Sequence, residues 1–103
     1  MTTIPSQRND ILIRRHILEP GEALQWHTDL CQRVVVTIRG DLLRTEYRDS
    51  GETETVAAQP GTTHWSEPQP RVHRVVNVGN APYEKVVVFF LSEPEMEPEP
   101  EAR

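Results

Sequence analysis

The stretch from Gly21 to Gly40 reads GEALQWHTDLCQRVVVTIRG. It begins and ends with glycine, holds His27 and Asp29 two residues apart, and closes on a β-branched run. Alternate residues of a β-strand point to the same face, so a strand through these positions presents the imidazole and the carboxylate together. Arg33 shares this parity if no bulge intervenes. The stretch therefore predicts strands that carry an imidazole, a carboxylate and a guanidinium on one face.

Short β-type segments separated by turn residues continue along the rest of the chain. Nine prolines argue against long helices, and no segment shows a helical hydrophobic period. We expect about eight strands, at residues 11–18, 23–28, 33–39, 42–47, 53–57, 60–65, 72–78 and 84–91. This spacing predicts an all-β fold, an antiparallel sandwich or barrel.

Length and charge divide the chain into three parts. The 103 residues suffice for one domain. We expect an N-terminal arm at 1–10, a barrel at 11–91 and an acidic disordered tail at 92–103, which cannot bury apolar surface. The net charge is −5, and the tail, with five glutamates and one arginine, contributes −4 of it. A body with a net charge of only −1 offers no electrostatic footprint for nucleic acid or an anionic membrane.

The cysteine content, the N-terminal residues and the apolar runs of the sequence indicate the cellular compartment. Cys31 is the single cysteine, which excludes an internal disulfide and fits a reducing compartment. The N-terminal MTTIPSQRND lacks the basic-then-apolar pattern of a secretory signal. The longest apolar run is too short to span a bilayer. We expect a cytoplasmic protein.

Two strands are apolar on both faces, VVV at 34–36 and VVVFFL at 86–91. An antiparallel sheet with one solvated face should alternate apolar and polar residues. A doubly apolar strand therefore needs a second cover. We expect a homodimer that buries the outer face; the alternative is that part of the same chain folds over it.

The spacing of Gly21, His27, Asp29, Arg33 and Gly40 resembles the first cupin motif, G-x5-H-x-H-x3-E-x6-G. Asp29 stands in the place of the second histidine and Arg33 in the place of the glutamate. All of the spacings are kept, while two of the three ligand positions are altered.

Residues 61–77 resemble the second cupin motif, G-x5-P-x-G-x2-H-x3-N. His73 and Asn77 fall in place, Pro68 comes one residue late, and Pro70 stands where glycine is usual. The resemblance covers 11–91 and implies a double-stranded β-helix, the jelly-roll barrel. LEPGEALQWH and VHRVVNVGNAPYE are most similar to bacterial stand-alone cupins, some of them labelled β-alanine degradation proteins.

In such a barrel a distant strand can bring His73 beside His27. Two histidines and the Asp29 carboxylate on one face match the facial triad of non-haem iron sites. These three residues are the predicted ligands of one divalent transition metal (iron, manganese, nickel or zinc). The alternative is that no metal is bound and Asp29 forms a salt bridge with Arg33.

The chemistry of Arg33 distinguishes between a metal site and a metal-free site. A guanidinium cannot ligate a metal, and about 5 Å from a divalent ion it would repel it by on the order of 7 kcal/mol at an effective dielectric near 20. It is instead suited to bind a carboxylate or phosphate through a bidentate fork. We expect Arg33, His64 and Trp65 to bind an anionic ligand.

Other residues carry less chemistry. Cys31 is either a thiolate ligand for a soft metal or an inert buried thiol. His16 is predicted to be exposed, and core packing is the commoner role for Trp65 and Trp26. Asn77 is predicted to satisfy a turn.

The sequence thus supports a cupin-domain protein that binds a small, anionic metabolite in the barrel. One hypothesis is a metal-dependent enzyme, of oxygenase or isomerase type, acting on a small organic acid. The other is a metal-free binding module or pseudo-enzyme with a degenerate metal site.

Overall fold

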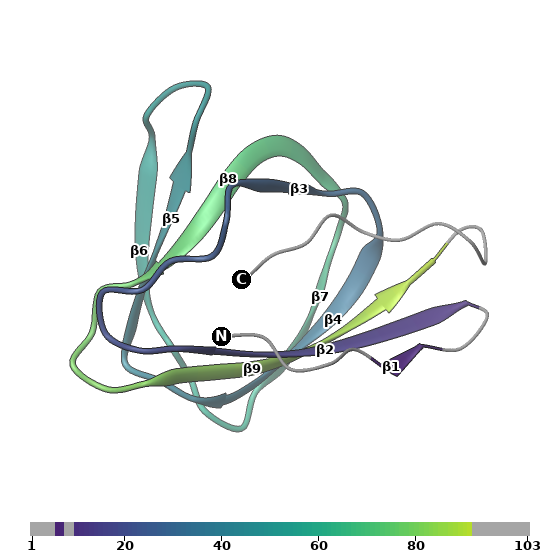
Figure 1. Cartoon of the computed structure of the whole chain (residues 1–103), viewed down its shortest axis with the longest axis horizontal. Coiled ribbons are helices and arrows are strands. Elements are labelled where there is room, and N and C mark those ends of the chain that lie inside the picture. The colour runs from purple at the N-terminus through teal and green to yellow at the C-terminus, as the bar shows by residue number, and fades with distance from the viewer. Residues whose placement is uncertain (1–5, 8–9, 92–103) are drawn as a thin grey trace.

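Two antiparallel β-sheets face each other across the interior of the protein (Figure 1). The computed structural model describes residues 6–7 and 10–91. The five-stranded sheet has the order β1 (Ser6–Gln7), β2 (Ile11–Leu18), β9 (Tyr83–Phe90), β4 (Gln32–Arg39), β7 (Thr63–Ser66). The four-stranded sheet has the order β3 (His27–Asp29), β8 (Gln69–Asn77), β5 (Leu42–Tyr47), β6 (Thr53–Ala57). The predicted all-β jelly roll is confirmed.

The expected boundaries hold best where a strand is regular. The strands at 11–18, 42–47 and 53–57 match the prediction, while residues 23–26 do not form a strand and touch β8 only through an isolated bridge from Ala23. The strand expected at 72–78 begins three residues earlier, because β8 starts at Gln69 and includes Pro70. The register shifts between His27 and Asp29. The β8 residues opposite this shift bulge, and a bulge tolerates a proline without a donor.

The ends of the chain are only partly described. Of the expected N-terminal arm, Ser6–Gln7 pairs with β2 as a short strand. The rest of that arm before Asp10, and the expected acidic tail at 92–103, lie outside the described residues. In the described part of the chain, no helix is long and apolar enough to cross a membrane.

Side chains that alternate inward from the two sheets build the core. One buried cluster lies on the inner face of the five-stranded sheet and next to the ends of β4 and β9. Its members are Leu12, Cys31, Val35, Val87, Phe89 and Leu91. A second consists of Leu18, Leu24 and Tyr83, with Leu43, Ala58 and Val75 packed against it. The free thiol of Cys31 is therefore buried among apolar side chains.

The strand parity corrects one expectation. His16, predicted to be exposed, is fully buried. It lies on β2 with the same parity as Leu12 and Leu18, which are both buried. The partial alternation of ILIRRHIL therefore places the histidine on the inner face.

The doubly apolar strands have one face in the core and one on the outside. Val87 and Phe89 of β9 are fully buried, whereas Phe90 is 36% exposed on the outer face. Trp65 of β7 stacks on Phe90, with ring centroids 5.4 Å apart, and is 66% exposed. Core packing is thus the wrong role for Trp65. The described residues leave this outer face open to a partner.

Gly40 and Asn77 stabilise two turns next to the barrel. Gly40 has a φ of +154°, and a Cβ there would lie 2.7 Å from Cδ1 of Tyr83. Asn77 is fully buried. Its amide donates to the carbonyl oxygens of Leu18 and Ala81 and accepts from the Gly79 N–H. The predicted turn role of Asn77 is confirmed.

Candidate functional site

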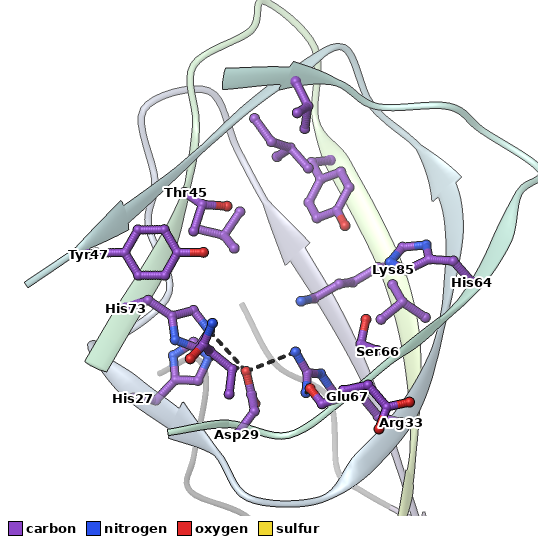
Figure 2. A pocket seen from close by; sticks show the side chains of 16 residues that line it. His27, Asp29, Arg33, Thr45, Tyr47, His64, Ser66, Glu67, His73 and Lys85 are labelled. Carbon is purple, nitrogen blue, oxygen red and sulfur yellow. Dashed lines mark hydrogen bonds and ion pairs between the residues drawn. The ribbon is translucent and has the colours of Figure 1, made fainter. Parts of the chain in front are cut away.

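Neighbouring strands bring the predicted ligand residues together. His27 on β3 lies directly opposite His73 on β8, and the ring centroids are 4.5 Å apart. Asp29 follows two residues later and points to the same space (Figure 2). All three residues are buried, and each offers one ligand atom within 4.8 Å of the others. The grouping expected from the motif spacing is present.

Backbone carbonyls fix the orientation of both imidazole rings. Nδ1 of His27 lies 2.7 Å from the Gln25 carbonyl oxygen, and Nδ1 of His73 lies 2.7 Å from the Arg71 carbonyl oxygen. A carbonyl oxygen only accepts, so each ring donates from Nδ1. In the neutral ring, Nε2 then carries the lone pair. This is the arrangement in which a histidine binds a metal through Nε2.

The two Nε2 atoms face the same carboxylate oxygen. Oδ2 of Asp29 is 2.9 Å from Nε2 of His73 and 3.4 Å from Nε2 of His27. Two lone-pair atoms at such distances repel unless a proton or a metal ion lies between them. The other carboxylate oxygen, Oδ1, is buried and has no hydrogen-bond partner among the residues that the structure describes. Two imidazole nitrogens and a carboxylate with an unsatisfied oxygen fit a divalent transition metal.

Arg33 reaches into the same cluster from β4. Its Nη2 lies 3.2 Å from Oδ2 of Asp29, and its Nη1 donates to the Glu67 carbonyl oxygen at 3.2 Å. The salt bridge between Asp29 and Arg33 that the sequence left as an alternative is therefore formed in this structure. A guanidinium carries five N–H donors in a fixed fork, so Arg33 can also donate to a ligand beside the cluster.

These contacts set the charge of Asp29. Burial raises the pKa of the Asp29 carboxyl, but hydrogen bonds from His27 and His73, which require a proton on each Nε2, and the positive charges of His27 and Arg33 outweigh it. The net effect holds the pKa well below its usual value. Asp29 is thus a carboxylate at neutral pH, the form that ligates a metal.

The cluster lies at the wall of a cavity of about 390 Å³ between the two sheets. The side chains that line it are His27, Asp29, Arg33, Val35, Leu43, Thr45, Tyr47, Val56, His64, Ser66, Glu67, Gln69, His73, Val75, Tyr83 and Lys85. A volume of this size holds a small metabolite.

The expected anion-binding residues divide between the cavity and the outer surface. Arg33 and His64 line the cavity, whereas Trp65, its neighbour along β7, does not. Adjacent strand residues point to opposite faces, so His64 and Trp65 cannot both face inward. Cys31 is outside the lining, and its burial, followed by the charge of Asp29, raises the pKa of its thiol. The thiolate alternative is disfavoured.

Sequence reasoning missed the contributions of β5 and β9. Thr45 and Tyr47 project from β5, and Lys85 projects from β9 (Figure 2). The signal for Lys85 was available, because a lysine inside EKVVVFFL has the parity of the buried Val87 and Phe89.

The comparisons with known proteins identify the fold. No protein-family model matches the chain, and no curated protein does. A cupin domain from Bordetella pertussis Tohama I is 20% identical over 86% of this chain and 93% of its own, with a TM-score of 0.74. A double-stranded β-helix protein from Klebsiella pneumoniae is 17% identical over 99% and 82%, with a TM-score of 0.65.

An enzyme is also among the similar structures. An oxalate oxidase in complex with the substrate analogue glycolate is 20% identical over 82% of this chain, with a TM-score of 0.61. This chain spans 44% of that protein. The resemblance to small single-domain cupins is thus confirmed at the level of the fold. The chain is a cupin-type double-stranded β-helix with a His-Asp-His cluster inside.

Proposed function

We propose that the protein is a metal-dependent enzyme acting on a small organic acid inside the barrel. His27, Asp29 and His73 would hold one divalent transition metal (iron, manganese, nickel or zinc), and Arg33 would bind the carboxylate of the acid. The observation that carries this proposal is the contact between His73 Nε2 and Asp29 Oδ2 at 2.9 Å, with Nδ1 donating to a carbonyl. Such a pair needs a proton or a metal ion between its lone pairs, and the proposal places a metal ion there.

The chain itself supplies binding, orientation and shielding. The two Nδ1 hydrogen bonds fix the histidine rings before any ligand arrives. Arg33 has N–H groups left to grip a carboxylate next to the cluster. When bound, a metal supplies Lewis acidity and open coordination positions of the kind that oxygenases and isomerases use. The oxalate oxidase structure with glycolate shows that this fold accommodates a small organic acid in another protein.

Elemental analysis tests the metal site. Protein purified without a histidine tag would be stripped with a chelator and reconstituted with each of the four metals in turn. We expect one ion per chain in the parent and none in His27→Ala or His73→Ala. His64→Ala serves as the matched control, because His64 lies at the cavity but outside the ligand cluster. A parent that retains no ion after reconstitution would exclude the enzyme proposal.

The metal-free alternative has its own supporting observation. Nη2 of the Arg33 guanidinium already contacts Oδ2 of Asp29 at 3.2 Å. A proton on His73 would also satisfy the pair with Asp29, as an imidazolium–carboxylate contact. In that case the barrel is a binding module for an anion. Thermal shifts from small carboxylates that persist after metal removal, and that disappear in Arg33→Met, would favour this alternative.

A homodimer is a further part of the proposal. Directly paired residues of neighbouring strands share a face, so Ile13, Val88, Val34 and Trp65 form one row across the outer surface of the five-stranded sheet. An isologous contact would place this apolar row against its copy. We expect a dimer by light scattering coupled to size exclusion, and a monomer for Val88→Glu. A parent that is monomeric at all concentrations would contradict it.

A further inference from the structure

Tyr47 extends the row of the two histidines across the inner face of the four-stranded sheet. It lies directly opposite His73, which in turn lies opposite His27. Directly paired residues share one face of a sheet, with Cα atoms about 5 Å apart. The ring centroids of Tyr47 and His73 are 6.0 Å apart, and both side chains line the cavity. Tyr47 is therefore the next side chain in the row beyond the proposed metal ligands.

The hydroxyl of Tyr47 points into the cavity (Figure 2). In the described part of the chain, the contacts of Tyr47 are made by its ring and its backbone, and none uses the hydroxyl oxygen. Packing alone does not require this oxygen, because a phenylalanine ring would make the same contacts. A phenol is both a donor and an acceptor of hydrogen bonds, so the hydroxyl can donate to a molecule bound in the cavity.

Arg71 fixes the direction of the Tyr47 ring. The central carbon of its guanidinium lies 4.0 Å from the ring centroid. A fork on Asp49 holds this guanidinium, with Nε 3.1 Å from Oδ2 and Nη2 2.9 Å from Oδ1, and Nη2 also contacts Glu52 at 3.2 Å. A planar group held at two points keeps one orientation over the ring. The turn after β5 and the strand β8 therefore fix the phenol together.

The same arginine also orients a proposed metal ligand. The Arg71 carbonyl oxygen accepts from Nδ1 of His73 at 2.7 Å, while the Arg71 side chain holds Tyr47. Arg33 reaches the cluster from β4, in the other sheet (Figure 2). An anion bound at the cluster therefore has a guanidinium on one side and a phenol on the other.

We propose that Tyr47 donates a hydrogen bond to a carboxylate oxygen of the acid bound at the cluster, and that Arg71 is the positioning residue that directs the phenol there. This inference rests on the proposed function, in which Arg33 and the metal cluster receive that carboxylate. A hydrogen bond to a charged acceptor is roughly twice as strong as one between neutral groups. Tyr47 is thus a ligand-binding residue, distinct from the three residues that could hold the metal.

Calorimetric titration of the full-length protein with acetate and with butyrate, at a measured metal content, tests the role of Tyr47. Tyr47→Phe removes only the hydroxyl. We expect this variant to bind the acids about tenfold more weakly than the parent, because it loses a hydrogen bond to a charged group. Its metal content and its thermal unfolding midpoint should match those of the parent, because the hydroxyl makes no contact within the described residues.

A double-mutant cycle tests the role of Arg71. Arg71→Met keeps the backbone carbonyl but removes the cation over the Tyr47 ring. We expect it to lower the acid affinity of the parent by about fivefold and to cause no further loss in the Tyr47→Phe background. Arg74→Met is the matched control, because Arg74 lies on the same strand, 4.5 Å from the Trp26 ring, and pairs with Glu46 at 2.8 Å. This control should keep the affinity of each background.

Two results would overturn the inference. Acid affinity in Tyr47→Phe equal to that of the parent would show that the phenol does not touch the ligand. An equal loss in Arg71→Met with and without the Tyr47 hydroxyl would show that Arg71 does not act through the phenol. If the acids bind and need Arg33 in either case, the proposed function stands and only the contradicted role falls. If neither acid binds to the parent, both the function and the inference fall.

Discussion

Removing the Arg33 guanidinium should have opposite effects on the two ligands of the barrel. In Arg33→Met the side chain keeps its length and apolar stem but loses its charge and its donors. We expect the protein to bind a divalent metal more tightly and a carboxylic acid more weakly. The reason is that Arg33 contacts Oδ2 of Asp29, the atom that would also ligate the metal.

The distances give the magnitude of this effect. Nη2 of Arg33 is 3.2 Å from Oδ2 of Asp29, and a metal on that oxygen would lie about 2.1 Å from it. The ion and the guanidinium are then about 5 Å apart, and at an effective dielectric near 20 their repulsion is on the order of 7 kcal/mol. The Asp29 charge between them offsets part of this. We expect a net gain of about 3 kcal/mol, or roughly 100-fold in metal affinity.

Competition with a chromophoric chelator measures this affinity directly. The metal-stripped parent, Arg33→Met and Arg44→Met would be titrated with zinc and with manganese in the same buffer. Arg44 is the matched control, because it pairs with Glu46 away from the cavity. The same three proteins would then be titrated with the carboxylic acid that the parent binds best, and only Arg33→Met should lose affinity.

The reasoning fails if Arg33→Met binds metal no better than the parent. A weaker affinity would mean that Arg33 acts as an outer-shell partner that orients Asp29 for the metal, a role that hydrogen-bonded carboxylate ligands often require. An unchanged affinity would mean that the guanidinium moves away when the metal binds.

Three further changes test the framework of the barrel. Gly40→Ala would place a Cβ 2.7 Å from Cδ1 of Tyr83 at a φ of +154°, so chemical denaturation should show a loss of about 3 kcal/mol. Asn77→Ala removes three hydrogen bonds made by a fully buried side chain, and its thermal melt should report a loss of about 2–4 kcal/mol. The hydrogen bond from Arg74 lowers the pKa of Glu46 from 4.5, so the stability from this carboxylate is present above pH 4.5 and lost as the pH falls. Glu46→Gln should therefore flatten the acid limb of the stability profile.

Each of these changes has a matched control in the same chain. Gly51→Ala meets no atom within 4 Å, although its φ of +74° still costs about 1 kcal/mol. Asn80→Ala alters an exposed amide of the neighbouring turn, and Glu54→Gln an exposed carboxylate. Equal effects in a variant and its control would show that the named contact is not the cause.

The strands could be predicted because a strand with one buried face alternates apolar and polar residues along the sequence. Residues 11–18 and 42–47 alternate or stay apolar between clear turns, and both strands form as expected. The expected strand at 72–78 starts too late, because the bulge that admits Pro70 depends on the pairing of β8 with β3, two segments about forty residues apart. His16 was misread because its neighbours, two arginines, suggested solvent. A paired strand, and not the local composition, decided that its face is buried.

The class of fold and the convergence of His27, Asp29 and His73 could be predicted from the sequence, because they depend on strand parity and on the resemblance to two motifs, the first of which keeps all of its spacings. Three placements became known only from the folded structure: Arg33 contacts Asp29, Trp65 points outward, and Lys85 reaches the cavity. The direction of a long side chain depends on which strands pair beside it and which charges it meets across the barrel. Those neighbours are distant in the chain, so the local sequence pattern does not predict the direction of such a side chain.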